Sequence, residues 1–144
     1  MSVRYAEYDD VKLAMDDNTL VRLTDDNGFG EADQDVVEQY LDTASDQING
    51  KIGMRVSLPL SVPYPPILKG WNVDIAVYYL FGRRNDSAGD VWQQRYEDAI
   101  SGLNAIATGR MSLGIDDPDG TANKMSVRSS AADRVFSRDK MRAF

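Results

Sequence analysis

The chain has 144 residues, the size of one ordinary globular domain, because two separate cores would each approach the smallest that folds alone. With 42% hydrophobic residues it has enough apolar material to build a core. It contains no cysteine and no histidine, which excludes disulfides, thiolate or imidazole metal sites, cysteine nucleophiles and His-dependent triads. The net charge of −7 argues against a protein that grips nucleic acid through an overall cationic surface.

Charge is distributed unevenly along the chain. Residues 1–46 hold 13 Asp and Glu against 3 Lys and Arg, whereas residues 47–144 hold 10 against 13. The last 21 residues, from Lys124, carry six basic and two acidic side chains. An acidic head and a basic tail favour head-to-tail association between copies, although charge runs are also typical of solvated segments.

The sequence predicts neither a signal peptide nor a membrane span. Residues 1–10 lack a basic region followed by an apolar run, which a signal peptide requires. The most apolar window, residues 67–81, is too short to cross a bilayer and contains Lys69 and Asp74. We therefore expect no membrane partner.

The first third of the chain predicts two short helices and then a long one. Start signals rich in aspartate and short apolar repeats place the short helices within residues 5–24. The Asp, Asn and Gly residues of the segment 25–30 indicate a turn, and it does not match a calcium loop because Val36 stands where the closing Glu is needed. Asp33 is an N-cap for a helix of about 20 residues. The apolar stripe of that helix comprises Val37, Leu41, Ala44, Ile48 and Ile52.

A proline-rich segment separates this helix from two more. Residues 55–66 contain four prolines, which neither a helix interior nor a central strand accepts. Alternating apolar residues predict an extended stretch along the helical core, formed by Val56, Leu58, Leu60 and Val62. Pro66 suits the first turn of a core helix that ends near Phe81, and Asp90 opens a last long helix that ends at Gly109. The apolar stripe of the first of these helices contains Leu68, Trp71, Ile75 and Tyr78 or Tyr79. The apolar stripe of the second contains Trp92, Tyr96, Ala99, Leu103 and Ile106.

These elements predict an all-α fold. We expect a small helical bundle with short N-terminal helices, two long antiparallel helices and a further core helix, together with the proline-rich extended segment. Residues 1–115 form this helical domain, and residues 116–144 form a flexible basic C-terminal tail. The tail ends in an apolar and basic group made of Arg134, Val135, Phe136, Arg138, Lys140, Met141, Arg142 and Phe144. We expect this group to dock on an acidic neighbouring surface, and the alternative is a tail that packs on its own subunit or has no contact.

Three side chains in the core helices stand out as structural candidates. Asp74 lies among apolar and aromatic residues, where an unpaired carboxylate is costly to bury. We expect it to pair with Arg55 or Arg95, or to accept hydrogen bonds, and this is favoured over a catalytic role. Trp71 and Trp92 lie on the apolar stripes of two different helices, so we expect both indoles to be substantially buried.

The remaining charged motifs do not indicate a catalytic site. Arg83 and Arg84 follow Gly82 at a helix end, where they are able to bind a phosphate but also simply favour the helix dipole. Glu97 and Asp98 are adjacent and point to different faces of one helix, so they do not form the carboxylate pair of a glycosidase. The sequence therefore predicts a protein that is not an enzyme, with no cofactor and no metal site.

Short motifs follow one another in an ordered set along most of the chain. They are Tyr5 with Asp10-Val11, Leu20 with Leu23-Thr24-Asp25, Ala44-Ser45 with Ile48, Arg55, Leu58-Pro59-Leu60, Pro65-Pro66 with Leu68, Asp74-Ile75-Ala76, Arg95-Tyr96 with Ala99, Gly109, Leu113-Gly114, and Arg134-Val135-Phe136-Ser137-Arg138-Asp139. This set resembles the Mu-like phage neck protein family, whose members are small head-tail connector or head-completion proteins. The first 46 residues and the region 116–130 are its least distinctive parts.

The resemblance implies a structural virion protein, a homo-oligomeric ring that is usually a dodecamer, located in the neck and assembled in the host cytoplasm. It implies the capsid portal protein and a tail or tail-terminator protein as partners, with no catalytic residues. An acidic inner wall allows DNA to pass, because it neutralises no phosphates. Two other functions stay open: a monomeric or dimeric phage accessory or regulatory protein that binds another protein, and a cell-wall hydrolase that uses carboxylates alone.

Overall fold

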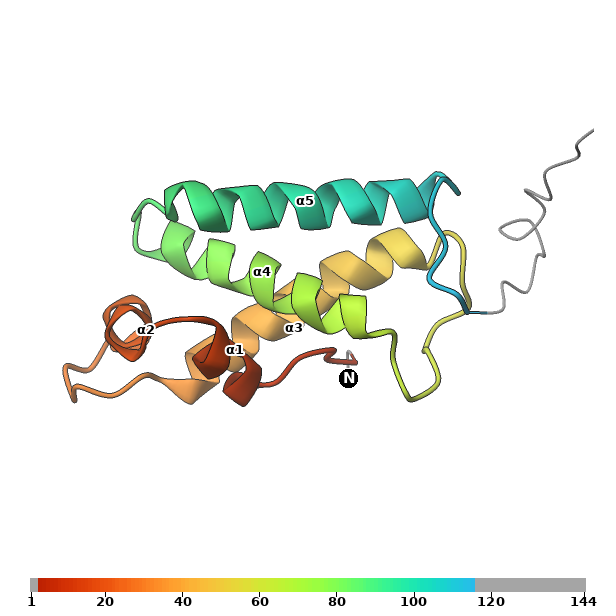
Figure 1. Ribbon diagram of the computed structural model, residues 1–144. Helices are drawn as coiled ribbons and strands as arrows, with labels where there is room; N and C mark the ends of the chain where they lie inside the picture. Colours follow the sequence, from red (N-terminus) through yellow and green to blue (C-terminus); the bar gives the residue numbers. More distant parts are fainter. Residues whose placement is uncertain (1–2, 116–144) are drawn as a thin grey trace, which may run out of the picture.

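The computed structural model describes residues 3–115, which contain five helices and no strand (Figure 1). The helices are α1 (Tyr8–Ala14), α2 (Asp17–Thr24), α3 (Gln34–Ile52), α4 (Pro66–Arg83) and α5 (Gly89–Ala107). The predicted all-α helical bundle is thereby confirmed. None of these five helices is long and apolar enough to cross a membrane. The predicted tail, with Arg134, Val135, Phe136 and Arg138, lies outside the described residues.

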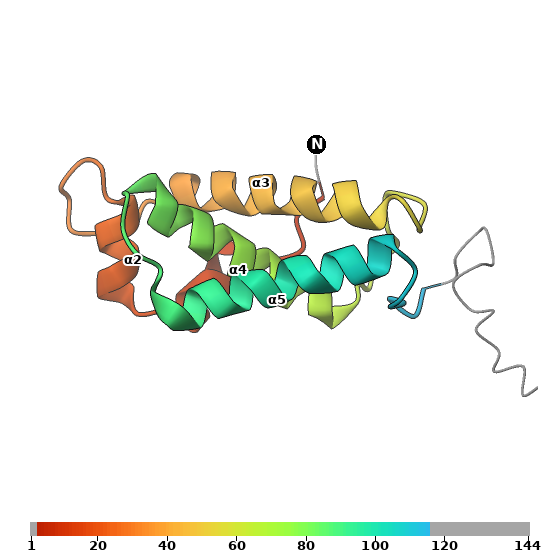
Figure 2. The same ribbon diagram turned by 90° about the horizontal axis from the view of Figure 1, so that it is seen from above.

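Helix α4 is the centre of the bundle. It packs against α3 on one side and α5 on the other, and it runs antiparallel to both (Figures 1 and 2). Helices α3 and α5 consequently run in the same direction. The three helices have 19, 18 and 19 residues. The two that the sequence predicts as the long antiparallel pair, α3 and α5, are thus parallel to each other, and each is antiparallel to α4, the predicted further core helix. The short helices α1 and α2 pack on α3 and α4, on the side away from α5.

Local sequence explains where the helices begin. The carboxylate of Asp16 accepts the backbone N–H of Thr19 at 2.9 Å at the start of α2. The carboxylate of Asp33 accepts the N–H of Asp35 at 3.0 Å at the start of α3. Pro66 is the first residue of α4, where its missing N–H costs nothing because that position has no intrahelical partner. Asp33 and Pro66 are the helix starts that the sequence predicts, whereas the sequence places the start of the second short helix at Asn18 or Thr19 and not at Asp16.

The core is apolar except for three buried polar side chains. Its largest fully buried members come from all five helices: Val11, Leu20, Leu23, Val37, Leu41, Ile48, Ile52, Leu68, Ile75, Leu80, Leu103 and Ile106. Asn72 is buried with them and serves as a polar junction. Its side chain accepts the N–H of Ala6 at 2.8 Å and the hydroxyl of Ser45 at 3.2 Å, and it donates to the carbonyl of Leu41 at 3.0 Å. It thus ties the N-terminal segment and α3 to α4.

The proline-rich segment does not lie along the core as predicted. Leu60 is buried and Val56 is half-buried, but Leu58 is 41% exposed and Val62 is 75% exposed. Figure 1 shows the reason, because the chain crosses the end of the bundle here and does not run beside a helix. Where the chain crosses the end of the bundle, only the side chains that face the helices become buried. The alternation of apolar residues therefore did not predict their burial.

Candidate assembly surfaces

The two ends of the bundle differ in charge. The acidic end comprises residues 17–35 and 83–90 and contains eight Asp and Glu against three Arg. The basic end comprises residues 49–65 and 107–115 and contains one Lys and two Arg with no Asp or Glu. Both views place these segments at opposite ends of the long helices, which are each about 28 Å long at 1.5 Å per residue. The charge asymmetry of the sequence is therefore also an asymmetry along the molecule.

A tight turn shapes the acidic end. One carboxylate, that of Asp25, accepts the backbone N–H groups of Gly28 at 2.8 Å, Phe29 at 3.1 Å and Gly30 at 2.8 Å. These bonds to the charged form lower the pKa of Asp25, with Gly30 making the largest contribution. Gly28 and Gly30 have φ values of 74° and 78°, in the left-handed region that favours glycine. The segment is the turn that the sequence predicts.

Two arginines join this turn to the end of α4. Arg83 Nη1 donates to the carbonyl oxygen of Leu23 at 3.1 Å, and Arg84 Nε donates to the same oxygen at 3.3 Å. Both guanidinium groups also pair with the carboxylate of Asp26, and Arg83 is the main reason why the pKa of Asp26 is lowered. The two arginines hold the C-terminus of α2 against α4, so their donors already have protein partners.

Arg55 closes the basic end. Its Nε donates to the carbonyl oxygen of Ala107 at 3.1 Å; α5 ends at this residue, so no further helical turn supplies a backbone N–H to donate to that oxygen. Its guanidinium lies against Gly109, where an added Cβ would approach Nη2 to 3.0 Å. Within residues 3–115, neither Arg55 nor the two other cations of this end, Lys51 and Arg110, takes part in an ion pair. The cations of the basic end are therefore not neutralised inside the described subunit.

Asp74 pairs with Arg95 and not with Arg55. The distance from Arg95 Nη1 to Asp74 Oδ1 is 3.9 Å, across the contact between α4 and α5. Burial raises the pKa of Asp74, and Arg95 opposes this shift. Arg55 is occupied at the end of α5, so the alternative partner in the sequence prediction was wrong. The arrangement is a structural ion pair at the edge of the core.

The two tryptophans are partly buried and pack against the core. Trp71 is half-buried and lies on Gly102 of α5, where an added Cβ would come within 2.4 Å of Trp71 Cζ2. Trp92 is half-buried beneath the guanidinium of Arg95, which lies 4.8 Å from the centre of a Trp92 ring. Both indoles lie at the margin of the contact between α4 and α5, since the periodicity of a helix gives the face but not the distance from the centre of the core.

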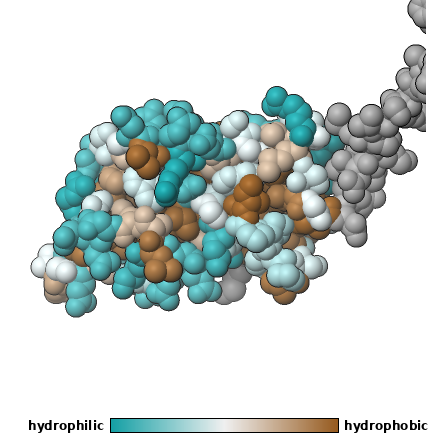
Figure 3. All heavy atoms as spheres, viewed as in Figure 1, coloured by the Kyte–Doolittle hydropathy of each residue, from teal (hydrophilic) through white to brown (hydrophobic). Residues whose placement is uncertain are grey.

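Exposed apolar side chains accompany the charges at both ends. Phe29 is 81% exposed and Val91, next to the acidic end on α5, is 65% exposed. Met54, Leu58 and Val62 are 67%, 41% and 75% exposed at the basic end. Five of the seven large exposed hydrophobic residues within residues 3–115 thus lie at or beside an end. In Figure 3 hydrophilic surface dominates around the acidic end, and apolar surface is more frequent toward the other. Apolar groups beside charge are typical of protein interfaces.

Comparison with known proteins gives the family. Residues 5–131 match the family model described as "Bacteriophage Mu, Gp36". The chain is also 34% identical over 113 residues to the "Mu-like prophage FluMu protein gp36" of Haemophilus influenzae, and this region covers 78% of the chain and 77% of that relative. The predicted likeness to a Mu-like phage family is confirmed. The chain belongs to the Bacteriophage Mu Gp36 family and is a phage protein.

Proposed function

We propose that this phage protein is a head-tail connector of the virion neck. In this proposal twelve identical copies form a ring that joins the capsid portal to the tail and leaves a channel for DNA. Family membership supports a role in a phage particle. The observation that carries the proposal is the opposite charge of the two ends of one rigid helical bundle.

The two ends suit a head-to-tail contact between copies. When the acidic end of one copy meets the basic end of the next, each subunit uses two different surfaces, and such a heterologous contact closes into a ring when its rotation closes. The opposite charges guide the encounter and fix its orientation. The exposed apolar side chains then provide the burial, with Phe29 and Val91 on one side and Met54 and Leu58 on the other.

The acidic balance of the folded part also suits the passage of DNA. Residues 3–115 contain 18 Asp and Glu against 10 Lys and Arg. The exposed faces of the long helices include Asp35 and Asp46 on α3 and Glu97 and Asp98 on α5. A wall with these side chains releases no counterions from DNA, so a duplex gains no binding energy from the contact. We propose that an acidic surface of this kind lines the channel.

Electron microscopy of particles made without this chain tests the proposal. We expect DNA-filled heads and complete tails that are not joined, and normal virions once the wild-type chain is supplied. A supplied Lys51→Glu/Arg110→Glu variant should fail to restore joining, because it reverses the charge of the basic end. Lys12→Glu is the control, since it reverses an exposed cation on α1 that does not belong to the basic end. Joined infectious particles without the chain, or a complete lack of heads, would contradict the connector function.

A further inference from the structure

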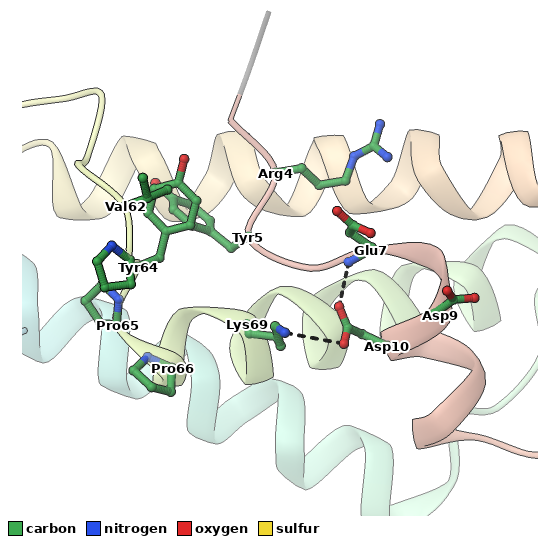
Figure 4. A pocket seen from close by; sticks show the side chains of 11 residues that line it. Arg4, Tyr5, Glu7, Asp9, Asp10, Val62, Tyr64, Pro65, Pro66 and Lys69 are labelled. Atoms are coloured by element: carbon green, nitrogen blue, oxygen red, sulfur yellow. Dashed lines mark hydrogen bonds and ion pairs between the residues drawn. The ribbon is translucent and has the colours of Figure 1, made fainter.

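A groove lies between the N-terminal segment and the start of α4. It has a volume of about 660 Å³, within the range of sites that enclose a small ligand or a few side chains. Figure 4 shows that it has two halves. Tyr5, Val62 and Tyr64, together with three prolines, form an apolar half, and Glu7 and Asp9 lie at the other.

The acidic half of this groove has more carboxylates than free cations. Of the two cations in the lining, Arg4 pairs with Asp42 of α3 at 2.8 Å, and Lys69 pairs with Asp10 at 3.5 Å. Glu7 and Asp9 have no ion-pair partner within residues 3–115. The groove therefore offers uncompensated negative charge beside an aromatic and proline surface.

The chain contains a segment with the complementary chemistry. Residues 134–144 carry four Lys and Arg against one Asp, interleaved with two phenylalanines, one valine and one methionine. Phenylalanine and methionine side chains suit the apolar half, and the arginines suit the carboxylates of Glu7 and Asp9. We propose that this groove binds residues 134–144 of the same chain.

Chain length and position favour the same chain over another copy. Ile115 packs beside Arg55 and Val56 at the basic end, and the segment 57–65 leads from there to the groove. A random coil of 18 residues, the number from 116 to 133, has an average end-to-end distance of about 23 Å. This reach is close to the length of one long helix, so the segment is present at the groove at an effective concentration in the millimolar range. A second copy at micromolar concentration does not compete with it.

Binding in this way covers the exposed side chain of Val62 and the carboxylate of Asp9. The inference does not depend on the connector function, because it concerns contacts within one subunit.

Paramagnetic broadening in the full-length chain tests the inference. Because the chain has no natural cysteine, Ala132→Cys gives one attachment site for a nitroxide, just before the binding segment. We expect selective broadening of the backbone amides of residues 5–10 and of the non-proline residues of 62–69. The same broadening should be absent from isotope-labelled chains without nitroxide that are mixed with unlabelled nitroxide chains. Broadening of comparable strength in this mixture would assign the segment to a second copy and overturn the inference, as would an unaffected groove.

Two matched pairs of variants test the two halves of the groove. Val62→Ser should reduce the broadening several-fold, whereas Val91→Ser, at a similarly exposed valine on α5, should leave it unchanged. Asp9→Lys should also reduce it, whereas Asp90→Lys, in the first turn of a different helix, should not. All four positions are exposed, so the fold is expected to tolerate each change. Equal effects within either pair would overturn the inference.

Discussion

The acidic end and the basic end satisfy their polar groups in different ways. At the acidic end, Asp25 binds the N–H groups of its own turn and Asp26 pairs with Arg83. At the basic end Arg55 donates to the carbonyl of Ala107 and Arg110 donates to the hydroxyl of Thr108. None of the three cations of this end has an ion-pair partner within residues 3–115, and its large apolar side chains Met54, Leu58 and Val62 are exposed. One end is thus fixed by contacts inside the subunit, and the other presents groups that a neighbour can use. Substitutions should accordingly affect stability at the first and assembly at the second.

The largest effect on stability is expected at Thr24. This hydroxyl is fully buried beside the acidic end, where it donates to the carbonyl of Leu20 at 2.8 Å and accepts the N–H of Asp33 at 3.0 Å. Thr24→Val keeps the shape but leaves that N–H unpaired, so urea denaturation should show a loss of about 1–3 kcal/mol. Thr43→Val is the control, because its exposed hydroxyl bonds only to Gln39. Equal losses in the two variants would show that the buried bond has no special weight.

A smaller loss is expected at Arg83. The Arg83→Met variant gives up the bonds to Leu23 and Asp26, but Arg84 contacts the same two partners and the site is partly exposed. We expect a loss of about 1 kcal/mol in the free energy of unfolding. Arg110→Met at the basic end should stay within about 0.5 kcal/mol. If Arg110→Met proves the more destabilising, the contrast between the two ends is wrong.

Acid should weaken the acidic end selectively. The pKa values of Asp25 and Asp26 are lowered in the folded chain by backbone bonds and by Arg83, respectively. Their stabilisation is present above the unfolded value of about 3.9 and is lost as the pH falls through the folded pKa. Asp74 acts in the opposite direction, because its pKa is raised by burial. Unfolding measured between pH 6 and 3 should therefore depend less steeply on pH in Asp26→Asn than in the wild type; identical slopes would contradict this.

The smallest effect on stability is expected at Leu58 of the basic end. Because this side chain is 41% exposed, Leu58→Ser should change the free energy of unfolding by about 0.5 kcal/mol or less. The same change should nevertheless lower the fraction of assembled protein in light scattering. Leu13→Ser removes an even more exposed leucine, 88% accessible on α1, and should leave assembly unchanged. An equal effect of both on assembly would place the contact elsewhere.

Local sequence predicted the helices and their boundaries well. The aspartate at position 33, the proline at 66 and the Asp-rich turn at 25–30 each carry their own structural signal, and the structure has the predicted element at each. The ordered motifs likewise predicted the phage family, which the match of residues 5–131 confirms. Features that depend on residues close together in the sequence could therefore be predicted from the sequence alone.

Contacts between distant residues were not predictable in the same way. Nothing adjacent to Asn72 marks it as a junction, because its partners lie up to 66 positions away. The pairing of Arg83 and Arg84 with Asp26 likewise depends on how α2 and α4 pack. For Asp74, composition left Arg55 and Arg95 as equal candidates, and only the fold chooses between them. Which of these residues pair depends on how the helices pack against one another, and the periodicity of the sequence does not determine that packing.

A charge-swap experiment tests the head-to-tail contact most directly. One variant, Glu31→Lys/Asp35→Lys/Asp90→Lys, changes the net charge of the acidic end from −5 to +1, and another, Lys51→Glu/Arg110→Glu, changes that of the basic end from +3 to −1. Light scattering should show rings for the wild type and no rings for either variant alone, because each then places like charges in contact. An equimolar mixture should restore rings in which the variants alternate, since opposite charges again meet at every contact. Rings from either variant alone, or no rings from the mixture, would contradict the account.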